Sequence, residues 1–262
     1  MNILVSGAAS GIGMAFVRAL LEKGHKVFAV DVLPIDRADV RSFVADVRSE
    51  EDMAEIYAAL ETDGVVLDAI VNVAGVHTMA SLVESDFAQM KRVIDVNLLG
   101  AMLFNKTFHP LLSKQGRIVI VSSEVAPLDP MPFNGLYSLS KTALDSYAQA
   151  LRQELNLIGQ KVVTVRPGAI ETPLCRSSLS ATETLASETR LYSSQADRFL
   201  GLTKRFMGKP MSADRFAKIL VKATVKKHPR LIYKKHHNPG LVLLSILPKR
   251  LQCALIKLLL NR

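Results

Sequence analysis

The stretch Gly7-Ala8-Ala9-Ser10-Gly11-Ile12-Gly13 follows an apolar run, Asn2 to Ser6, and precedes a helical pattern from Met14 to Lys23 that Gly24 ends. Three glycines let the backbone turn sharply, approach a pyrophosphate closely and pack the helix on the strand. Their spacing is G-x-x-x-G-x-G rather than the commoner G-x-G-x-x-G. We predict a strand, turn and helix unit that binds dinucleotide phosphates at the helix N-terminus. The alternative is a glycine turn without a ligand.

An acidic residue follows the next apolar run, which extends from His25 to Val30 and ends at Asp31. An acid about 20 residues beyond such a turn accepts hydrogen bonds from the adenosine ribose hydroxyls. A 2′-phosphate at that place would meet a like charge at a cost of roughly a few kcal/mol, and the next residues, Val32 and Leu33, supply no cation. The sequence therefore favours NAD over NADP. The alternative is that Asp31 only begins the turn before Pro34.

Strand and helix patterns alternate along the next part of the chain. We expect strands at 42–45, 67–73, 116–121 and 161–166, and helices at 50–60, 87–106 and 136–155. Uniformly apolar strands alternating with helices are typical of a parallel sheet that is covered on both faces. The predicted fold class is α/β: a single Rossmann-type doubly wound parallel sheet with helices on both faces, plus a C-terminal helical extension. Ligands of such sheets bind at the carboxyl ends of the strands, where Asp31, 72–75 and 122–123 fall.

Tyr137 and Lys141 are four residues apart at the start of the predicted helix 136–155, so they share one face. A phenol has a pKa of about 10 and is a poor base at neutral pH. A unit charge at about 5 Å, with an effective dielectric of about 20, is worth roughly 3 kcal/mol, or about two pKa units. We therefore expect Lys141 to lower the pKa of Tyr137 into the range of acid and base catalysis. A solvated pair without a function is the alternative.

Composition indicates one globular domain, residues 1–262, because 262 residues with 49% hydrophobic side chains can bury a sizeable core. Cys175 and Cys253 are far apart in the sequence and suggest no disulfide framework. Strand-like sequence from Asn2 onward leaves no room for a targeting segment. We therefore expect a cytoplasmic protein.

The net charge of +9 is concentrated near the end of the sequence. Residues 215–262 contain twelve Lys or Arg and no Asp or Glu, whereas residues 1–214 contain 21 basic and 24 acidic residues. Neither a zinc-finger spacing nor an aromatic-rich nucleic-acid motif accompanies this charge. We expect no nucleic-acid partner.

Together, these motifs resemble those of the short-chain dehydrogenase/reductase family, in its form of about 250 residues. The matching motifs span roughly residues 2–175 in order: Gly7-x-x-x-Gly11-x-Gly13, Asp46-Val47, Asn72-x-Ala74-Gly75, Asn97, Ser123, Tyr137-x-x-x-Lys141 and Pro167-Gly168. The resemblance implies catalytic roles for Asn97, Ser123, Tyr137 and Lys141, no metal, and a homodimer or homotetramer. It also implies cofactor contacts from Gly7, Ser10, Gly11, Ile12, Gly13, Asp31, Asp46, Val47, Asn72, Ala74, Gly75, Tyr137, Lys141, Pro167, Gly168, Ile170 and Thr172.

The resemblance also implies a mechanism. In the oxidative direction, Ser123 would hydrogen-bond the substrate oxygen, and Tyr137 as phenolate would accept the hydroxyl proton while hydride passes to the nicotinamide. Lys141 would lower the pKa of Tyr137 and hold the nicotinamide ribose, and Asn97 would position a water that relays the proton.

Three positions depart from the family pattern. Ser6 stands where threonine is usual, and Val73 stands where a second asparagine is frequent. Ser123 lies 14 residues before Tyr137 rather than 13, so the loop 124–134 carries one extra residue. We keep Ser123 as the catalytic serine, with Ser122 in reserve, because a loop insertion can preserve the geometry.

The last part of the chain is the most individual. Residues 174–210 follow the last expected cofactor contact and are predicted to form a substrate lid. The extension 226–262 combines basic clusters with two apolar runs, 241–247 and 251–260, each shorter than a membrane span. These runs could lie on a membrane surface, cover an apolar substrate pocket, or pack on the core or on another subunit.

The chemistry of the substrate is left open by these motifs. The apolar extension favours a lipophilic alcohol or ketone, such as a steroid, retinoid or other lipid. The alternatives are a sugar or polyol dehydrogenase of the same family, a protein that senses NAD without turnover, and a membrane-surface binding protein.

Overall fold

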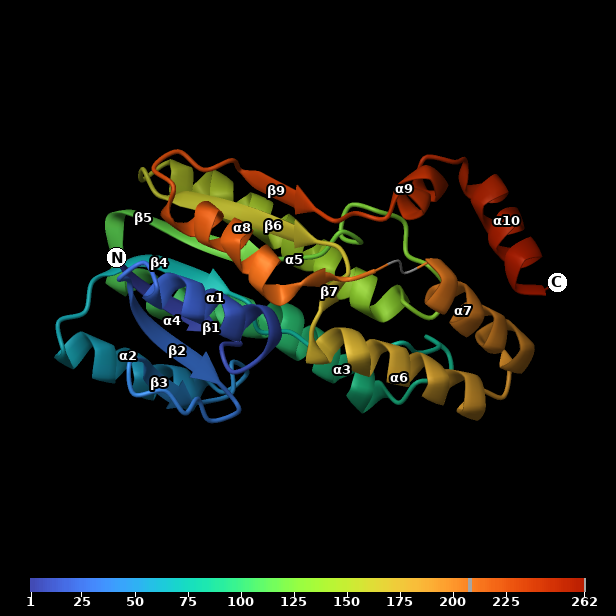
Figure 1. Cartoon of the computed structure of the whole chain (residues 1–262), viewed down its shortest axis with the longest axis horizontal. Coiled ribbons are helices and arrows are strands. Elements are labelled where there is room, and N and C mark those ends of the chain that lie inside the picture. The colour runs from blue at the N-terminus through green and yellow to red at the C-terminus, as the bar shows by residue number, and fades with distance from the viewer. Residues whose placement is uncertain (207–208, 262) are drawn as a thin grey trace.

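The centre of the protein is a seven-stranded parallel sheet with the strand order β3-β2-β1-β4-β5-β6-β9 (Figure 1). The computed structural model describes residues 1–206 and 209–261. The strands of the sheet are β1 (Asn2–Ser6), β2 (Lys26–Asp31), β3 (Arg41–Val44), β4 (Leu67–Asn72), β5 (Leu112–Val121), β6 (Lys161–Pro167) and β9 (Ile232–Lys235). The strand order reverses direction between β1 and β4, and ligands of doubly wound sheets bind at such a switch point.

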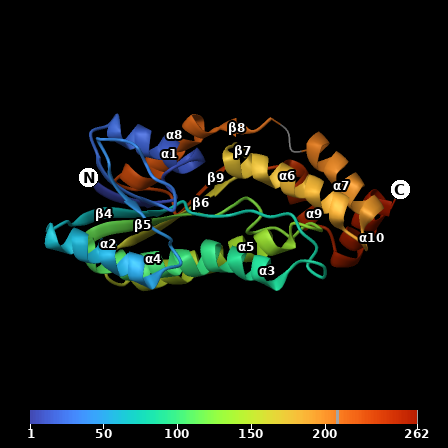
Figure 2. The same cartoon turned by 90° about the horizontal axis from the view of Figure 1, so that it is seen from below.

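The strands are apolar because both faces of the sheet are covered by helices. α1 (Gly11–Leu21) and α8 (Ala213–Val225) lie on one face, and α2 (Glu50–Thr62), α4 (Gly100–Phe108) and α5 (Gly135–Asn156) lie on the other (Figure 2). Each face has its own hydrophobic core, with Phe16 and Phe216 on the first side and Phe28, Phe104 and Phe108 on the second. The predicted fold class is confirmed by this three-layer arrangement.

The predicted helix 87–106 is a composite of three helical segments. α3 (Phe87–Ile94) continues into a π-helical turn, η1 (Asp95–Leu99), and then into α4, after which a short 3-10 turn, η2 (His109–Leu111), leads into β5. A π turn accommodates one extra residue and occurs frequently at functional sites. In this chain it contains Asn97.

Two parts of the sheet differ from the expectation by more than two residues. β5 begins at Leu112 rather than at residue 116, and its pairing with β4 is irregular between Leu67 and Ala69. Part of the predicted extension 226–262 belongs to the sheet, because β9 pairs with β6 and forms an edge strand. The helical part of the extension is confirmed as α9 (Pro239–Ser245) and α10 (Lys249–Asn261).

The segment predicted as a lid contains two helices, α6 (Pro173–Glu188) and α7 (Ser193–Phe206), which pack against each other. Two short strands, β7 (Ile170–Glu171) and β8 (Met211–Ser212), flank this segment in the sequence and pair with each other in parallel. Positions 207 and 208 of this segment lie outside the described residues. α10 packs against α7, so α6, α7, α9 and α10 form an outer lobe beyond one end of the sheet (Figure 1).

Within residues 1–206 and 209–261, none of the helices combines the length and the apolar character that crossing a membrane requires.

Candidate active site

A cavity of about 310 Å³ lies at the carboxyl ends of β1, β2 and β4. The register explains its position, because Ser6 at the end of β1 pairs with both Val30 and Asn72 and so brings three strand ends together. Many of the predicted cofactor residues line it: Gly7, Ser10, Gly11, Ile12, Gly13, Asp31, Asp46, Val47, Ala74, Gly75 and Thr172.

The glycine turn cannot carry side chains at two of its positions. Gly7 has φ +69°, and a Cβ atom on it would lie 2.5 Å from the backbone nitrogen of Ala74. A Cβ atom on Gly13 would lie 1.9 Å from the Gly7 carbonyl oxygen. The Ser10 side chain makes no capping hydrogen bond to the described first turn of α1, so amides of this turn are left for another acceptor. The cavity therefore fits the pyrophosphate of a dinucleotide.

Asp31 is held at the wall of this cavity. One carboxylate oxygen accepts from the Ala9 amide at 2.9 Å, and the other accepts from the Leu33 amide at 3.0 Å. Two arginines that belong to none of the motifs, Arg48 and Arg92, line the same cavity. Hydrogen bonds from Arg48 hold the pKa of Asp46 below its ordinary value, and the guanidinium is thereby tied to that carboxylate.

Several expected cofactor residues are not among those that line the cavity. Asn72 is buried, and its Nδ2 donates to Asn105 Oδ1 at 2.7 Å. Gly168 packs closely against the extension, since a Cβ atom on it would lie 1.8 Å from the His236 carbonyl oxygen. Ile170 is buried in β7, and Pro167 is the last residue of β6. Cofactor contacts by these residues stay predictions.

The two candidate serines at the end of β5 have different surroundings. The Ser123 hydroxyl lies near the Tyr137 phenol and favours its ionised form. The Ser122 hydroxyl instead donates to the Lys141 carbonyl oxygen at 3.3 Å and is buried against α5. The extra residue in the loop 124–134 therefore leaves Ser123 facing the tyrosine.

Lys141 extends along the same helix face as Tyr137. Its ammonium donates to the Val121 carbonyl oxygen at 3.2 Å and lies 5.9 Å from the centre of the Tyr137 ring. Both side chains are buried. Burial lowers the pKa of Lys141 to about 8, because the charged form loses its hydration.

The expected direction of the tyrosine pKa is wrong for the protein on its own. The pKa of Tyr137 is raised to about 12, mainly by burial. The Ser123 hydrogen bond opposes this rise, and the nearby Glu124 carboxylate adds to it. The Lys141 charge favours the phenolate, but the cost of burying that phenolate is the larger effect here. At neutral pH, Tyr137 therefore holds its proton.

Asn97 is fully buried in the π turn and bridges two segments. Its Oδ1 accepts from the Val76 amide at 2.8 Å, while Nδ2 donates to the Val76 carbonyl oxygen and to Ser140 Oγ, each at 2.9 Å. A Cβ atom on Gly75 would lie 3.2 Å from Asn97 Oδ1 and 3.5 Å from Lys141 Nζ. The amide oxygen and the ammonium therefore face the same space beside Gly75.

Two further residues of this centre, Ser140 and His77, belong to none of the motifs. Ser140 Oγ donates to the Tyr137 carbonyl oxygen at 2.8 Å and links Asn97 to α5. The His77 ring lies 4.1 Å from the Tyr137 ring between centroids, and the Asn134 side chain lies beside its imidazole. Burial lowers the pKa of His77 to about 4, so its imidazole is neutral. A single histidine in a loop carries no spacing signal that could have found it.

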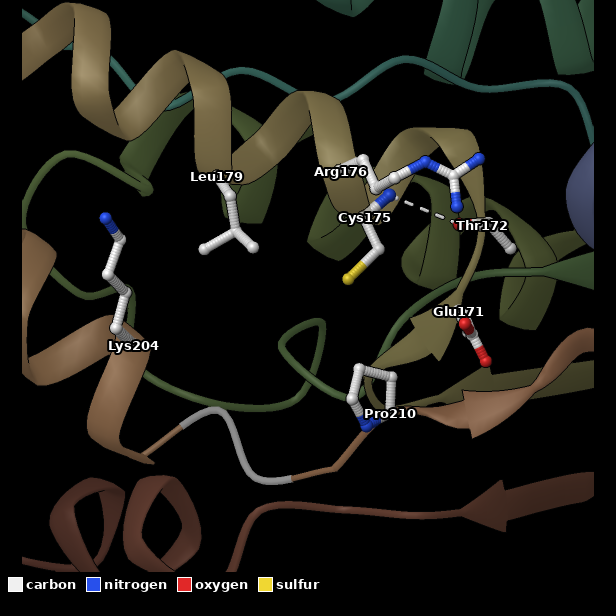
Figure 3. Close-up of a pocket in the computed structure, with 7 residues that line it drawn as sticks. All are labelled: Glu171, Thr172, Cys175, Arg176, Leu179, Lys204 and Pro210. Carbon is white, nitrogen blue, oxygen red and sulfur yellow. Dashed lines mark hydrogen bonds between the residues drawn. The ribbon is translucent and has the colours of Figure 1, made fainter.

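A second cavity, of about 300 Å³, lies beneath α6 and shares Thr172 with the first. Cys175 and Leu179 point into it from α6, and Lys204 and Pro210 border it from the other side (Figure 3). The shared residue places this cavity next to the first one, and most of its lining residues belong to the segment predicted as a lid.

Comparison with known proteins identifies the family. A model of the short chain dehydrogenase family matches residues 1–183. The chain is 31% identical over 200 residues to an NADPH-dependent 1-acyldihydroxyacetone phosphate reductase of Schizosaccharomyces pombe. The aligned region covers 72% of this chain and 67% of that protein.

Solved structures show the same fold. A short chain dehydrogenase of Burkholderia cenocepacia in complex with NADP has a TM-score of 0.74 at 19% identity, covering 97% of this chain and 96% of that one. A 3-ketoacyl-(acyl-carrier-protein) reductase of Brucella melitensis complexed with NADH has a TM-score of 0.70 at 22% identity, covering 89% and 96%. With the family model matching well over half of its residues, this chain belongs to the short-chain dehydrogenase family.

Proposed function

We propose that this protein is an NAD-dependent oxidoreductase that interconverts a secondary alcohol and a ketone, or an alcohol and an aldehyde, by hydride transfer. The observation that carries the proposal is that Ser123 and Lys141 lie beside the buried phenol of Tyr137. Lys141 also borders Gly75, which lines the 310 Å³ cavity, called the dinucleotide cavity below. The nicotinamide, when bound, supplies the hydride acceptor or donor.

Tyr137 is the proposed acid and base. Its hydroxyl holds a proton at neutral pH, so in the reductive direction it donates that proton to the substrate oxygen while Ser123 hydrogen-bonds the same oxygen. In the oxidative direction the phenolate accepts the hydroxyl proton of the alcohol. Since burial opposes that phenolate, oxidation depends on positive charge near the ring, and Lys141 is the cation that the chain provides.

Lys141 and Asn97 are the proposed path for the proton beyond Tyr137. They face a common space beside Gly75, and a water there could accept from Lys141 and donate to Asn97 Oδ1, whose other hydrogen bond comes from the Val76 amide. Lys141 would also hold the nicotinamide ribose.

We propose NAD rather than NADP as the cofactor because the Asp31 carboxylate is held at the cavity wall. NADP is the alternative, and two findings favour testing it. Arg48 and Arg92 line the cavity, and the relative from Schizosaccharomyces pombe is NADPH-dependent.

A lipophilic substrate is proposed from the side chains near the start of α5. Phe133 packs edge to face with Tyr192 and Phe199 of the outer lobe, and Leu82 lies next to Gly135. A sugar or polyol substrate would be the expectation if polar groups surrounded Tyr137. His77, whose ring centroid lies 4.1 Å from that of Tyr137, is a polar side chain that favours this second candidate.

Steady-state assays of the purified full chain would test these proposals. Cyclohexanone, a steroid ketone, retinal and an aldose would be offered with NADH and with NADPH, and the matching alcohols with NAD and NADP. We expect turnover of the apolar compounds with NAD(H). Cofactor binding without turnover of any compound would instead favour a non-catalytic NAD sensor.

The setting of the enzyme is also a prediction. A homodimer or homotetramer in the cytoplasm is expected from the family, and light scattering of the purified chain would measure the assembly. Peripheral membrane contact concerns a different surface, in the C-terminal extension.

A further inference from the structure

We propose that the outer faces of α9 and α10 form a docking surface for an anionic lipid bilayer. This inference goes beyond the proposed reaction and holds for any substrate of the enzyme. Both helices lie at one end of the molecule, beyond the carboxyl ends of the strands (Figure 1). The occupant is identified from apolar exposure, from the way these helices are held, and from charge.

The exposed residues of the two helices are largely apolar. Six large hydrophobic side chains of this region are between 40% and 73% exposed: Val242, Leu243, Ile246, Leu251, Leu258 and Leu259. Leu243 and Ile246 are three residues apart, and Leu251 and Leu258 are seven apart, so each pair shares a helix face. Apolar residues grouped in this way on a protein surface indicate an interaction site.

The opposite face of α10 is held against the protein. Gln252 and Leu260 are buried, Gln252 Nε2 donates to Asp129 Oδ2 at 3.1 Å, and Gln195 Nε2 of α7 donates to Asn261 Oδ1 at 2.9 Å. One face of α10 is therefore already used for packing against the rest of the same chain. The apolar side chains that stay exposed are a second face of a folded helix.

Charge selects the partner. Residues 215–262 contain twelve Lys or Arg and no Asp or Glu. On α10, Arg250 and Lys257 are exposed, seven residues apart, and each directly precedes an exposed leucine of the apolar stripe. Basic side chains beside an apolar helix face are the pattern that binds anionic lipid headgroups while leucines enter the acyl boundary. A second copy of the chain would instead bring two cationic faces together.

Vesicle cosedimentation with the full chain would test the proposal. The probes are vesicles of phosphatidylcholine alone and vesicles that also contain phosphatidylglycerol. The first variant carries Leu243→Ser, Ile246→Ser, Leu251→Ser and Leu258→Ser. The matched control is Leu157→Ser with Ile158→Ser, because these residues are 85% and 58% exposed next to the end of α5, outside the proposed surface.

We expect the unmodified chain and the control to sediment with the anionic vesicles, and the four-serine variant to bind at least about ten-fold more weakly. A second variant, Arg250→Glu with Lys257→Glu, keeps the apolar face and should also lose binding to anionic vesicles. If circular dichroism shows that the four-serine variant does not fold, this charge variant alone tests the proposal.

Two results would overturn the proposal. One is equal sedimentation of the unmodified chain with both kinds of vesicle, or with neither. The other is unchanged binding by both surface variants. A dimer that dissociates in the four-serine variant, without vesicle binding by the unmodified chain, would assign the surface to a second copy.

Discussion

The dinucleotide cavity and the outer lobe are held together in different ways. In the cavity, backbone meets backbone, and there is no room for one carbon atom between Gly7 and Ala74 or between Gly13 and Gly7. In the outer lobe, side chains reach across to loops. Glu84 accepts from the Thr189 hydroxyl at 2.5 Å and from the Arg190 amide at 2.8 Å.

This difference has a consequence for mutation. Where two backbone segments touch, an added side chain forces them apart and no other contact compensates. Where several exposed side-chain contacts share the load, removing one changes the free energy of unfolding little. Substitutions near the cavity and the buried phenol should therefore act on activity by orders of magnitude. Substitutions in the outer lobe should act by small factors.

Removal of the Tyr137 hydroxyl should have the largest effect. The Tyr137→Phe variant keeps the ring that packs against His77 but has no proton to exchange with the substrate. We expect turnover to fall about 10²–10⁴-fold, measured with the best substrate of the panel. Cofactor affinity, measured by fluorescence, should stay near that of the unmodified chain. Activity within ten-fold of the unmodified chain would remove Tyr137 from the mechanism.

A pair of glycine substitutions compares the two regions directly. Gly13→Ala places a Cβ atom 1.9 Å from a backbone oxygen, so the turn must move and the affinity for NADH should fall about 100-fold or more. Gly201→Ala lies in α7, where a Cβ atom would meet no described atom within 4 Å. It should stabilise the protein by about 0.5–1 kcal/mol, because alanine favours helix. Denaturant unfolding and NADH titration of both variants check this contrast, and equal affinities would refute it.

Most of the sheet could be predicted because its strands are continuous apolar runs. β9 could not, since Ile232–Lys235 has two lysines and follows a basic cluster, and its pairing with β6 depends on tertiary contacts. The π turn was not predictable either, because one additional residue in a helical turn leaves the periodicity nearly unchanged. The helices α6 and α7 were not predictable, because their many serines and threonines weaken the helical pattern and give the segment the composition of a polar loop.

The site residues were predictable where a motif fixes their spacing, as for Tyr137 and Lys141. Their electrostatics were not predictable, because spacing gives the distance to a charge but not the burial of the phenol, which raises its pKa. His77 and Ser140 belong to no motif, and only the folded chain brings them to Tyr137 and Asn97.

Asp31 tests the cofactor preference. The Asp31→Ala variant removes a carboxylate that would repel a 2′-phosphate, so the ratio of kcat/KM for NAD to that for NADP should fall about 10–100-fold. Asp39→Ala is a suitable control, because Asp39 is an exposed acid of the same region that pairs with Arg37. An unmodified chain that already prefers NADPH would contradict the assignment and would direct attention to Arg48 and Arg92.

The pH dependence should differ between the two directions of the reaction. The pKa of Lys141 is lowered to about 8 and that of Tyr137 is raised to about 12, so from pH 6 to 7 the ammonium is charged and the phenol is protonated. Reduction should therefore be constant over this range and fall about ten-fold per unit above pH 8, as Lys141 loses its proton. Oxidation needs the phenolate and should rise with pH up to that point. Rate profiles for kcat/KM with one ketone and its alcohol check both limbs, and parallel profiles would contradict the assignment.

The smallest effect is expected where the outer lobe contacts the loop between Ser123 and Tyr137. The Asp129 amide donates to Ser245 Oγ at 3.2 Å, and its carboxylate accepts from Lys249 and Gln252. The exposed ion pair is worth at most about 1 kcal/mol. Asp129→Ala should therefore lower the free energy of unfolding by less than that and slow turnover only about two- to five-fold, through a looser loop.

Asp63→Ala is the matched control for this prediction, because Asp63 forms an exposed ion pair with Arg41 far from the phenol in sequence and in the sheet. Both variants should lose similar stability in denaturant unfolding, but only Asp129→Ala should change kcat. If both leave kcat unchanged, the outer lobe contributes nothing to the position of the catalytic loop. A loss by Asp129→Ala as large as that of Tyr137→Phe would mean that the loop depends on this single tether, and the contrast between the two regions would fail.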